Sequence, residues 1–459
     1  MLRATRHLRT IRCIPRYYSK NDPPVIEVVD VTPRIKVDDI VGSLKEINFS
    51  VDKSRLVQKT YEKDENIPEG KEEENGLTKH LKQRIKAAGP ISMSTFMNEA
   101  LVNSEHGYYR TGTDTQIFGR SGDFVTSPDV SKMFGEMITI WLTTILSKLD
   151  QKKPIHLVEL GPGKGTLMKD ILDVLHRVEL TPDFLNVHLV EVSTGLREVQ
   201  NEVLGSPVTK TEFGRVPIYW HDDLSTLPTD DSVVFLAHEF FDALPVFQFE
   251  KTERGWSEVL VDVDQSAEVP QHFHQVLAPG QSVPAKLLEN QLSRFKQEVG
   301  TRAELAVYSL AFIQQISQII SERSGACLIV DYGTHEKSGF TCRGIYKHEF
   351  VNIFEKPGQV DLSVDVDWKE ITNAVEDYSN GALMTAGPQS QKGFLTLLGI
   401  DSRCSSLLRR ETSDEKCAKL LMSYERLVEQ MGESYQALCI VPKNMFVVTK
   451  EIPGFELEQ

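Results

Sequence analysis

The sequence predicts an α/β protein built on a parallel sheet, and three observations support this fold class. Apolar residues make up 40% and charged residues 25% of the 459 residues, which is the composition of an ordinary globular protein. From residue 154 onward, short apolar runs alternate with amphipathic segments, as expected for βαβ units. A glycine-rich turn joins the first of these strands to the first helix, where parallel sheets commonly bind ligands.

Each element of the predicted sheet follows from its local pattern. Strands are expected where apolar and β-branched residues run together, at 155–160, 187–192, 218–220, 233–237, 326–330, 437–441 and 445–448. Helices are expected where apolar residues recur every three or four positions, at 166–178, 196–203 and 305–323. A β-hairpin at 246–249 and 257–263 is predicted to open an insertion that covers about 246–300. The whole sheet domain is expected to occupy 154–450.

Three further regions precede the sheet domain. Residues 1–18 space five arginines among apolar residues without any acid, which predicts a mitochondrial transit peptide; a basic arm for RNA or lipid is the alternative. Residues 19–76 are polar and acidic, which predicts a disordered linker. Residues 77–153 begin with helices near 77–88 and 94–102. Their glycine- and tyrosine-rich part, 107–128, is interpreted as a lid over the site, with an ordinary surface loop as the alternative.

The composition also argues against several classes of protein. A net charge of −15 repels phosphate backbones, so we expect no nucleic-acid partner. The six cysteines form no CxxC pair and no Cys/His spacing for zinc, so we expect no metal. No run of apolar residues is long enough to predict a transmembrane segment.

The glycine-rich turn carries the clearest chemical signal. It reads Glu159-x-Gly161-x-Gly163-x-Gly165, directly after a predicted strand. Lys164 stands before the last glycine, which excludes a P-loop, and the glycine spacing does not fit the dinucleotide fingerprint of NAD oxidoreductases. A carboxylate beside the glycines suits a cofactor that bears an ammonium and a sulfonium and no pyrophosphate. The sequence therefore predicts binding of S-adenosylmethionine (SAM).

Two more acids end the next two predicted strands. Glu191 is placed to accept hydrogen bonds from the ribose hydroxyls, and Asp222 is placed to accept one from the adenine amine. A carboxylate that caps a helix is the alternative for each of them.

These motifs and others resemble those of the MidA family of SAM-dependent methyltransferases. The resemblance extends from about residue 89 to 443 and rests on segments 89–92, 107–109, 118–128, 134–135, 159–163, 191–193, 237–245, 331–333 and 387–389. It implies a class I, Rossmann-like methyltransferase sheet. It also implies that Gly122, Asp123 and Phe124 of the lid contact SAM, beside Glu159, the three glycines, Glu191 and Asp222.

The resemblance further implies a function and a partner. Mitochondrial members of the family assist assembly of respiratory complex I by methylating an arginine of one of its core hydrophilic subunits. We therefore expect an enzyme of the mitochondrial matrix that forms symmetric dimethylarginine on such a subunit. Its oligomeric state is left open, with a homodimer as one candidate. Two positions depart from the family pattern: His238 stands where many bacterial relatives carry Asn, and Tyr435 stands where Phe is common.

The expected catalytic residues follow the fourth strand of the sheet domain. An arginine acceptor needs carboxylates that grip its planar fork, and Glu239 and Asp242 stand where open α/β sheets bind ligands. His238 is a candidate base, with a histidine held by the backbone as the alternative. For Glu239 and Asp242 the alternative is that they only cap a following helix.

Other functions are compatible with the same fold. An assembly chaperone could retain the SAM fold without essential catalysis, but the intact glycine loop, Glu191 and Glu239 argue against it. Methylation of RNA is disfavoured by the acidic charge. Methylation of base or amide nitrogens is disfavoured because no Asn/Asp-Pro-Pro-Tyr/Phe sequence follows the fourth strand.

Overall fold

The computed structural model describes residues 57–58, 74–111, 126–150, 152–205, 216–228, 230–264, 272–333, 339–446 and 451–456. The predicted transit peptide and nearly all of the predicted linker lie outside these residues, as do Gly122, Asp123 and Phe124 of the lid. No helix in the described ranges is both long enough and apolar enough to cross a membrane.

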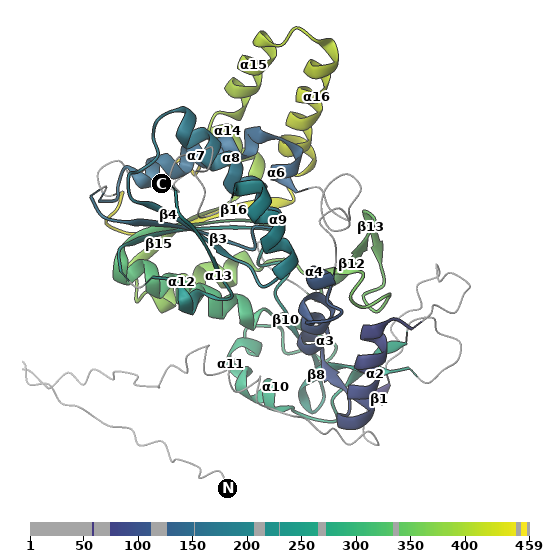
Figure 1. Cartoon of the computed structure of the whole chain (residues 1–459). Coiled ribbons are helices and arrows are strands. Elements are labelled where there is room, and N and C mark those ends of the chain that lie inside the picture. The colour runs from purple at the N-terminus through teal and green to yellow at the C-terminus, as the bar shows by residue number, and fades with distance from the viewer. Residues whose placement is uncertain are drawn as a thin grey trace, which may run out of the picture.

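A seven-stranded sheet forms the centre of the molecule (Figure 1), and it confirms the predicted α/β class. The strands lie in the order β15-β16-β11-β6-β3-β4-β5, and only β16 runs antiparallel to its neighbours. Their bounds are β3 Ile155–Leu160, β4 Leu185–Val190, β5 Ile218–His221, β6 Ser232–His238, β11 Gly325–Tyr332, β15 Leu383–Ser390 and β16 Tyr435–Pro442.

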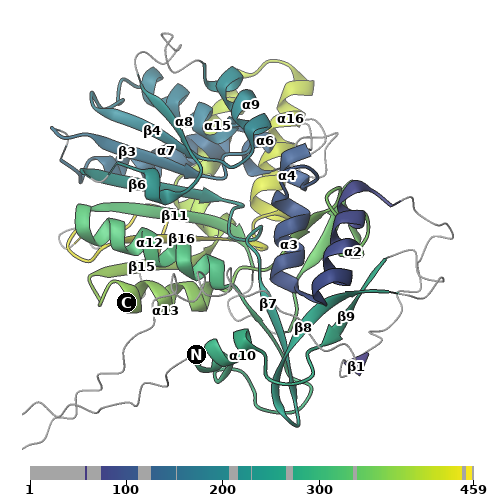
Figure 2. The same cartoon turned by 60° about the horizontal axis from the view of Figure 1, so that its bottom comes forward.

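Helices cover both faces of this sheet, which explains why its central strands are continuous apolar runs (Figure 2). In β3, Ile155 and Leu157 face one helical layer, whereas Val158 and Leu160 face the other, because successive side chains of a strand alternate. The first layer contains α7 Lys132–Leu146, α8 Thr166–Arg177, α9 Thr194–Leu204, α14 Gln391–Leu397 and α15 Ile400–Arg410. The second contains α12 Val307–Arg323 and α13 Trp368–Tyr378.

The register of the sheet brings the ends of its central strands to one level. Leu160 of β3 pairs with Val190 of β4 and with Ala237 of β6. In the same way, Val330 of β11 pairs with His238. The segments that follow these strands therefore meet at one edge of the sheet. They lie on either side of the switch point between β3 and β6, because β4 and β5 extend the sheet to one side of β3, and β6 and β11 extend it to the other.

A second sheet combines the N-terminal region with the insertion. It has the order β1-β9-β8-β7-β10, with β2 paired to β8. The predicted hairpin β7–β8 is therefore present, but it forms the middle of a larger sheet. Helices α2 and α3 pack against it, and Phe96 of α3 contacts Phe273 and Phe354 edge to face. The bounds are α2 Gly76–Ala88, α3 Met93–Val102, β1 Val57–Gln58, β2 Ile91–Ser92, β7 Phe247–Thr252, β8 Gly255–Val263, β9 Phe273–Leu277, α10 Val283–Leu287, α11 Glu289–Leu292 and β10 Arg302–Leu305.

The remaining elements surround the edge where the strand ends meet or project from the first helical layer. A small sheet, β13-β12-β14, follows β11, and helices α15 and α16 form an arm that projects from the molecule in Figure 1. The bounds are α4 Tyr108–Thr111, α6 Ser127–Val130, η2 Leu224–Thr226, β12 Arg343–Tyr346, β13 Glu349–Val351, β14 Asp361–Ser363, α16 Asp414–Glu425 and η3 Arg426–Gln430.

One predicted strand is wrong. Residues 445 and 446 form a turn, and residues 447 and 448 lie outside the described part of the chain. The edge strand beside β16 is β15 instead, which comes from 383–390.

The first prediction concerns Gly325, where β11 begins. This residue has φ of +148°, and a Cβ atom added to it would lie 1.8 Å from the carbonyl oxygen of Val233. We expect Gly325→Ala to lower the free energy of unfolding by about 2–4 kcal/mol, because the strand must shift or separate from β6. Gly280→Ala is the matched control, since nothing lies within 4 Å of the added atom. Urea denaturation of both variants checks this, and equal midpoints would contradict it.

Candidate active site

The glycine loop between β3 and α8 is the first component of the site. Gly161, Gly163 and Gly165 all have positive φ, at 60°, 54° and 81°, a conformation that other residues adopt only at a cost. A Cβ atom on Gly161 would lie 3.0 Å from the ring of Phe240, which belongs to the segment after β6. The loop thus needs its glycines both for its turns and for close approach to the neighbouring strand end.

Glu159 belongs to β3, two residues before Gly161, and is buried. Its Oε2 has no hydrogen-bond partner among the described residues. Burial raises the pKa of this carboxyl group to about 8. A buried carboxyl oxygen without a donor is a costly arrangement that a cationic ligand would relieve.

Gln200 of α9 connects the glycine loop to the ends of two other strands. Its Nε2 donates to the carbonyl oxygen of Gly163 at 2.7 Å and to Glu191 Oε2 at 3.2 Å, and its Oε1 accepts from Trp220 Nε1 at 2.8 Å. Glu191 Oε1 also accepts the N–H of Ser193 at 2.7 Å. The sequence predicted Glu191 here but gave no sign of Gln200, whose role depends on contacts across three elements.

Asp222 lies at the outer side of the same region. It follows β5, its side chain is 79% exposed, and its Oδ1 accepts a hydrogen bond from Arg197 at 2.7 Å. Arg197 Nε also donates to the carbonyl oxygen of Glu191, at 2.8 Å. Arg197 therefore links the ends of β4 and β5, and the adenine contact of Asp222 stays a prediction.

The segment after β6 carries the expected catalytic acids. Glu239 has φ of +50°, an uncommon backbone conformation for this residue type that often marks a functional turn. The N–H groups of Phe240, Phe241 and Asp242 all point to Asp331 Oδ2, at 3.1, 2.9 and 3.3 Å. The residues after Glu239 form turns, so the alternative that Glu239 and Asp242 cap a helix is wrong.

Each of the two acids has one oxygen held by a tyrosine. Tyr435 donates to Glu239 Oε1 at 2.9 Å, and Tyr332 donates to Asp242 Oδ2. Asp242 Oδ1 is buried and has no partner among the described residues. Burial, with the nearby charge of Asp242, raises the pKa of Glu239 to about 8, and burial also raises the pKa of Asp242.

His238 lies between Glu239 and the helix α7. Burial lowers the pKa of its imidazole to about 3, so the ring is neutral at pH 7. Its Nε2 lies 3.6 Å from Glu239 Oε1, and the ring packs edge to face on Phe134. A role as a base stays a prediction that the neutral ring permits.

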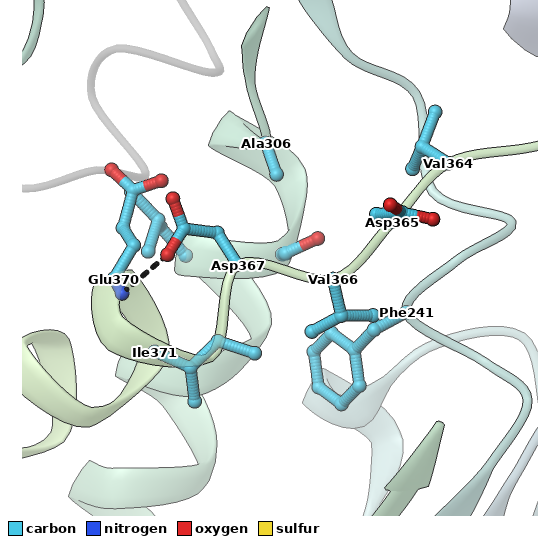
Figure 3. A pocket seen from close by; sticks show the side chains of 10 residues that line it. Phe241, Ala306, Val364, Asp365, Val366, Asp367, Glu370 and Ile371 are labelled. Carbon is cyan, nitrogen blue, oxygen red and sulfur yellow. Dashed lines mark hydrogen bonds between the residues drawn. The ribbon is translucent and has the colours of Figure 1, made fainter. Parts of the chain in front are cut away.

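A small pocket lies beside this segment but does not contain the acids. Phe241 lines it together with Val364, Asp365 and Val366, while Asp367 accepts the N–H of Glu370 at the start of α13 (Figure 3). None of the predicted catalytic or cofactor-binding residues lines this pocket.

Residues at the two ends of the predicted lid also approach the acids. Tyr109, near the start of the lid, donates to Asp361 Oδ1 at 3.0 Å. Asp129, after it, lies 3.8 Å from Lys164 of the glycine loop and contributes to the raised pKa of Glu239. Both ends of the predicted lid are thus next to the site.

Sequence reasoning missed the partners of the acids. Asp331 and Tyr332 belong to a motif noted in the sequence, and Tyr435 was noted as a departure from the family pattern, but neither observation indicated a contact with Glu239 or Asp242.

Comparisons with known proteins give a matching family and similar sequences. The profile of a family described as S-adenosyl-L-methionine-dependent methyltransferase matches residues 137–387. The protein arginine methyltransferase NDUFAF7, mitochondrial, of Danio rerio is 36% identical over 80% of this chain and 86% of its own length. The Bos taurus protein of the same name is 37% identical, over 80% and 83%.

A solved structure shows the same fold. It is a COG1565 superfamily member from Burkholderia thailandensis, bound to S-adenosyl-homocysteine (SAH). It is 23% identical, with a TM-score of 0.64 over 81% of this chain and 94% of the other.

The residues present fit a bound SAM. The unpartnered Glu159 oxygen suits the cationic part of the cofactor, the glycine loop leaves its backbone open to approach, and Glu191 retains lone pairs for hydroxyl groups.

The second prediction tests the role of Gln200. Leucine keeps the volume of this fully buried side chain but removes its three hydrogen bonds. We expect Gln200→Leu to weaken SAH binding by about tenfold or more in isothermal titration, because the Gly163 turn and Glu191 lose their common anchor. Gln318→Leu, at an exposed position of α12, is the control. Unchanged affinity in Gln200→Leu would refute the role.

The third prediction concerns stability against pH. The Glu239 carboxyl group titrates near 4.5 when unfolded and at about 8 when folded, so its contribution to stability is complete below pH 4.5 and is lost as the pH rises through about 8. Unfolding of Glu239→Gln should therefore release about one proton fewer than wild type between these values. Thermal midpoints measured from pH 5 to 9 check this, and parallel curves would contradict it.

Proposed function

Because the chain belongs to the MidA family of S-adenosyl-L-methionine-dependent methyltransferases, we propose that it transfers the methyl group of SAM to an arginine side chain of a protein. The observation that carries the proposal is the pair of carboxyl groups at the carboxyl end of β6, Asp242, which is buried, and Glu239, whose side chain is 14% exposed. The names of the curated relatives support arginine as the acceptor. When bound, SAM supplies an electrophilic methyl group.

The two acids suit a guanidinium group for a physical reason. Guanidinium is planar, always charged and presents several N–H donors, so it binds best between fixed carboxylate oxygens. Among the described residues, Asp242 Oδ1 has no hydrogen-bond partner, and Tyr435 bonds Oε1 of Glu239. We assign Asp242 Oδ1 and the second oxygen of Glu239 to the substrate arginine.

Glu239 is also suited to receive a proton. Methylation of a guanidinium nitrogen must be accompanied by loss of a proton, and a carboxylate whose pKa lies near the working pH is an effective acceptor. Burial and the neighbouring Asp242 give Glu239 such a pKa. In this proposal, Glu239 orients the guanidinium and takes its proton, and Asp242 orients it from the other side.

The remaining cofactor contacts belong to the same proposal. The glycine loop holds the amino-acid end of SAM with Glu159 nearby, Glu191 binds the ribose and Asp222 the adenine amine. Gly122, Asp123 and Phe124 of the lid cover the bound cofactor. The organisation predicted from the sequence, with residues 1–18 as a transit peptide and 19–76 as a linker, completes this picture.

Location and substrate follow from the same family. The relatives are named mitochondrial, and residues 1–18 have the composition of a transit peptide, which together support a mitochondrial location. We place the enzyme in the matrix, and we take its acceptor to be an arginine of a core hydrophilic subunit of respiratory complex I, converted to symmetric dimethylarginine.

The fourth prediction tests catalysis at Glu239. Glutamine keeps the shape of the side chain and its hydrogen bond from Tyr435 but removes the charge. We expect Glu239→Gln to slow single-turnover methyl transfer to an arginine peptide by about 100-fold or more, with SAH affinity changed less than about twofold. Glu415→Gln, on the exposed face of α16, is the matched control and should transfer normally.

The same variant distinguishes this enzyme from an assembly chaperone when assembly of complex I is measured beside methyl transfer. An assembly chaperone without essential catalysis would support complex I assembly equally well with Glu239→Gln as with the wild-type chain. Near-normal methyl transfer in Glu239→Gln would instead remove Glu239 from the reaction.

A further inference from the structure

Two tyrosines stand side by side beneath the acidic segment. Tyr332 of β11 and Tyr435 of β16 are direct partners in the register of these antiparallel strands. Their rings pack edge to face with centroids 5.4 Å apart. Both hydroxyl groups point to the segment after β6, where each donates to a different carboxyl group. Two phenol–carboxyl pairs are thus built from two neighbouring strands and one turn.

Each pair leaves one carboxyl oxygen for another partner. Tyr435 occupies Glu239 Oε1, and Tyr332 occupies Asp242 Oδ2 while also contacting Ser363. The other oxygen of Asp242 is buried without a partner in the described part of the chain. A side-chain carboxyl group can rotate about its last bond, so a donor on one oxygen also fixes where the other oxygen points.

We propose that Tyr435 and Tyr332 are positioning residues that orient Glu239 and Asp242 toward the substrate arginine, and that the Tyr435 hydroxyl keeps Glu239 available as a carboxylate. This inference rests on the proposed function. It goes beyond that function because it assigns the orientation and ionisation of the acids to two further residues, which act through their hydrogen bonds to Asp242 and Glu239.

The surroundings of Glu239 explain why such a donor matters. Asp242 from the turn and Asp129 from α6 both disfavour a negative charge on Glu239, and the charge of Glu239 in turn raises the pKa of Asp331 from β11. Asp129 is itself close to Lys164, and the neighbouring His238 is neutral. Among the described residues, the Tyr435 hydroxyl is therefore the hydrogen-bond donor that stabilises the ionised form of Glu239 directly.

Tyr435→Phe tests the inference with little disturbance of packing, because the ring stays. Removing the donor should raise the pKa of Glu239 further, so the rise of kcat/KM with pH should move to higher pH by about one. At pH 7, kcat/KM for an arginine peptide should fall by about tenfold, and it should return to within about twofold of wild type near pH 9.5. SAH affinity should not change.

Tyr424→Phe is the matched control. Tyr424 donates to Asp401 at 2.7 Å, which is the same type of contact on the arm formed by α15 and α16. Its removal should leave the pH profile unchanged. Tyr332→Phe should raise KM for the arginine peptide more than it lowers kcat, because Asp242 loses the partner that orients it.

A second measurement does not depend on the substrate. Infrared difference spectra against pH, with the Glu239→Gln variant used to identify the band, follow the protonated Glu239 carboxyl group directly. In Tyr435→Phe this band should persist to higher pH than in wild type. If wild type methylates no arginine peptide, the proposed function fails. The infrared midpoint still shows whether Tyr435 stabilises the ionised form of Glu239. Superimposable infrared and kcat/KM profiles for wild type and Tyr435→Phe would overturn the inference, as would a loss of rate that is equal at every pH.

Discussion

The candidate active site depends on one carboxylate, Asp331, which organises the turn that bears the acids. One of its oxygens accepts the N–H groups of Phe240, Phe241 and Asp242. Burial and the nearby charge of Asp242 raise the pKa of this carboxyl group. Because Asp331 is a residue of β11, the turn after β6 is held only when β6 and β11 pair in the correct register. The strained backbone of Glu239 is stable for the same reason, since the turn that follows it is fixed from the neighbouring strand. Strand pairing and site geometry are thus a single constraint.

The site is also destabilised in ways that a ligand would relieve. Glu159 Oε2, His238 Nε2 and Asp242 Oδ1 are all buried without partners among the described residues. Each such atom costs about 1–3 kcal/mol relative to a satisfied one. Two of the three are carboxyl oxygens, so cationic ligands are favoured at both the cofactor and the substrate side. A net charge of −15 acts in the same direction, because it attracts cationic partners over longer distances.

Much of the central sheet could be predicted from the sequence, because strands buried on both faces are uninterrupted apolar runs. Residues 155–160 form a strand with the predicted bounds. β15 was missed because Gly387 and Pro388 lie inside it, and both residues usually indicate a turn. The second sheet could not be predicted, since its strands come from segments as distant as 57–58 and 302–305 and are too short to be recognised alone. Within the site, position at a strand end predicted that Glu239 and Asp242 lie close together, and their catalytic roles stay predictions. Asp331 and Tyr435 act through contacts that span 90 and 196 residues, which local patterns do not reveal.

The proposed chemistry depends on one change of charge. The Glu239 carboxyl group is protonated at pH 7 before an arginine binds, and binding of the guanidinium group ionises it. Isothermal titration of an arginine peptide into the SAH-bound protein, repeated at pH 7 in buffers of different ionisation enthalpy, measures the protons released on binding. The account predicts release of about one proton in wild type and of almost none in Glu239→Gln. Binding without proton release in wild type, or equal release in the two proteins, would contradict it.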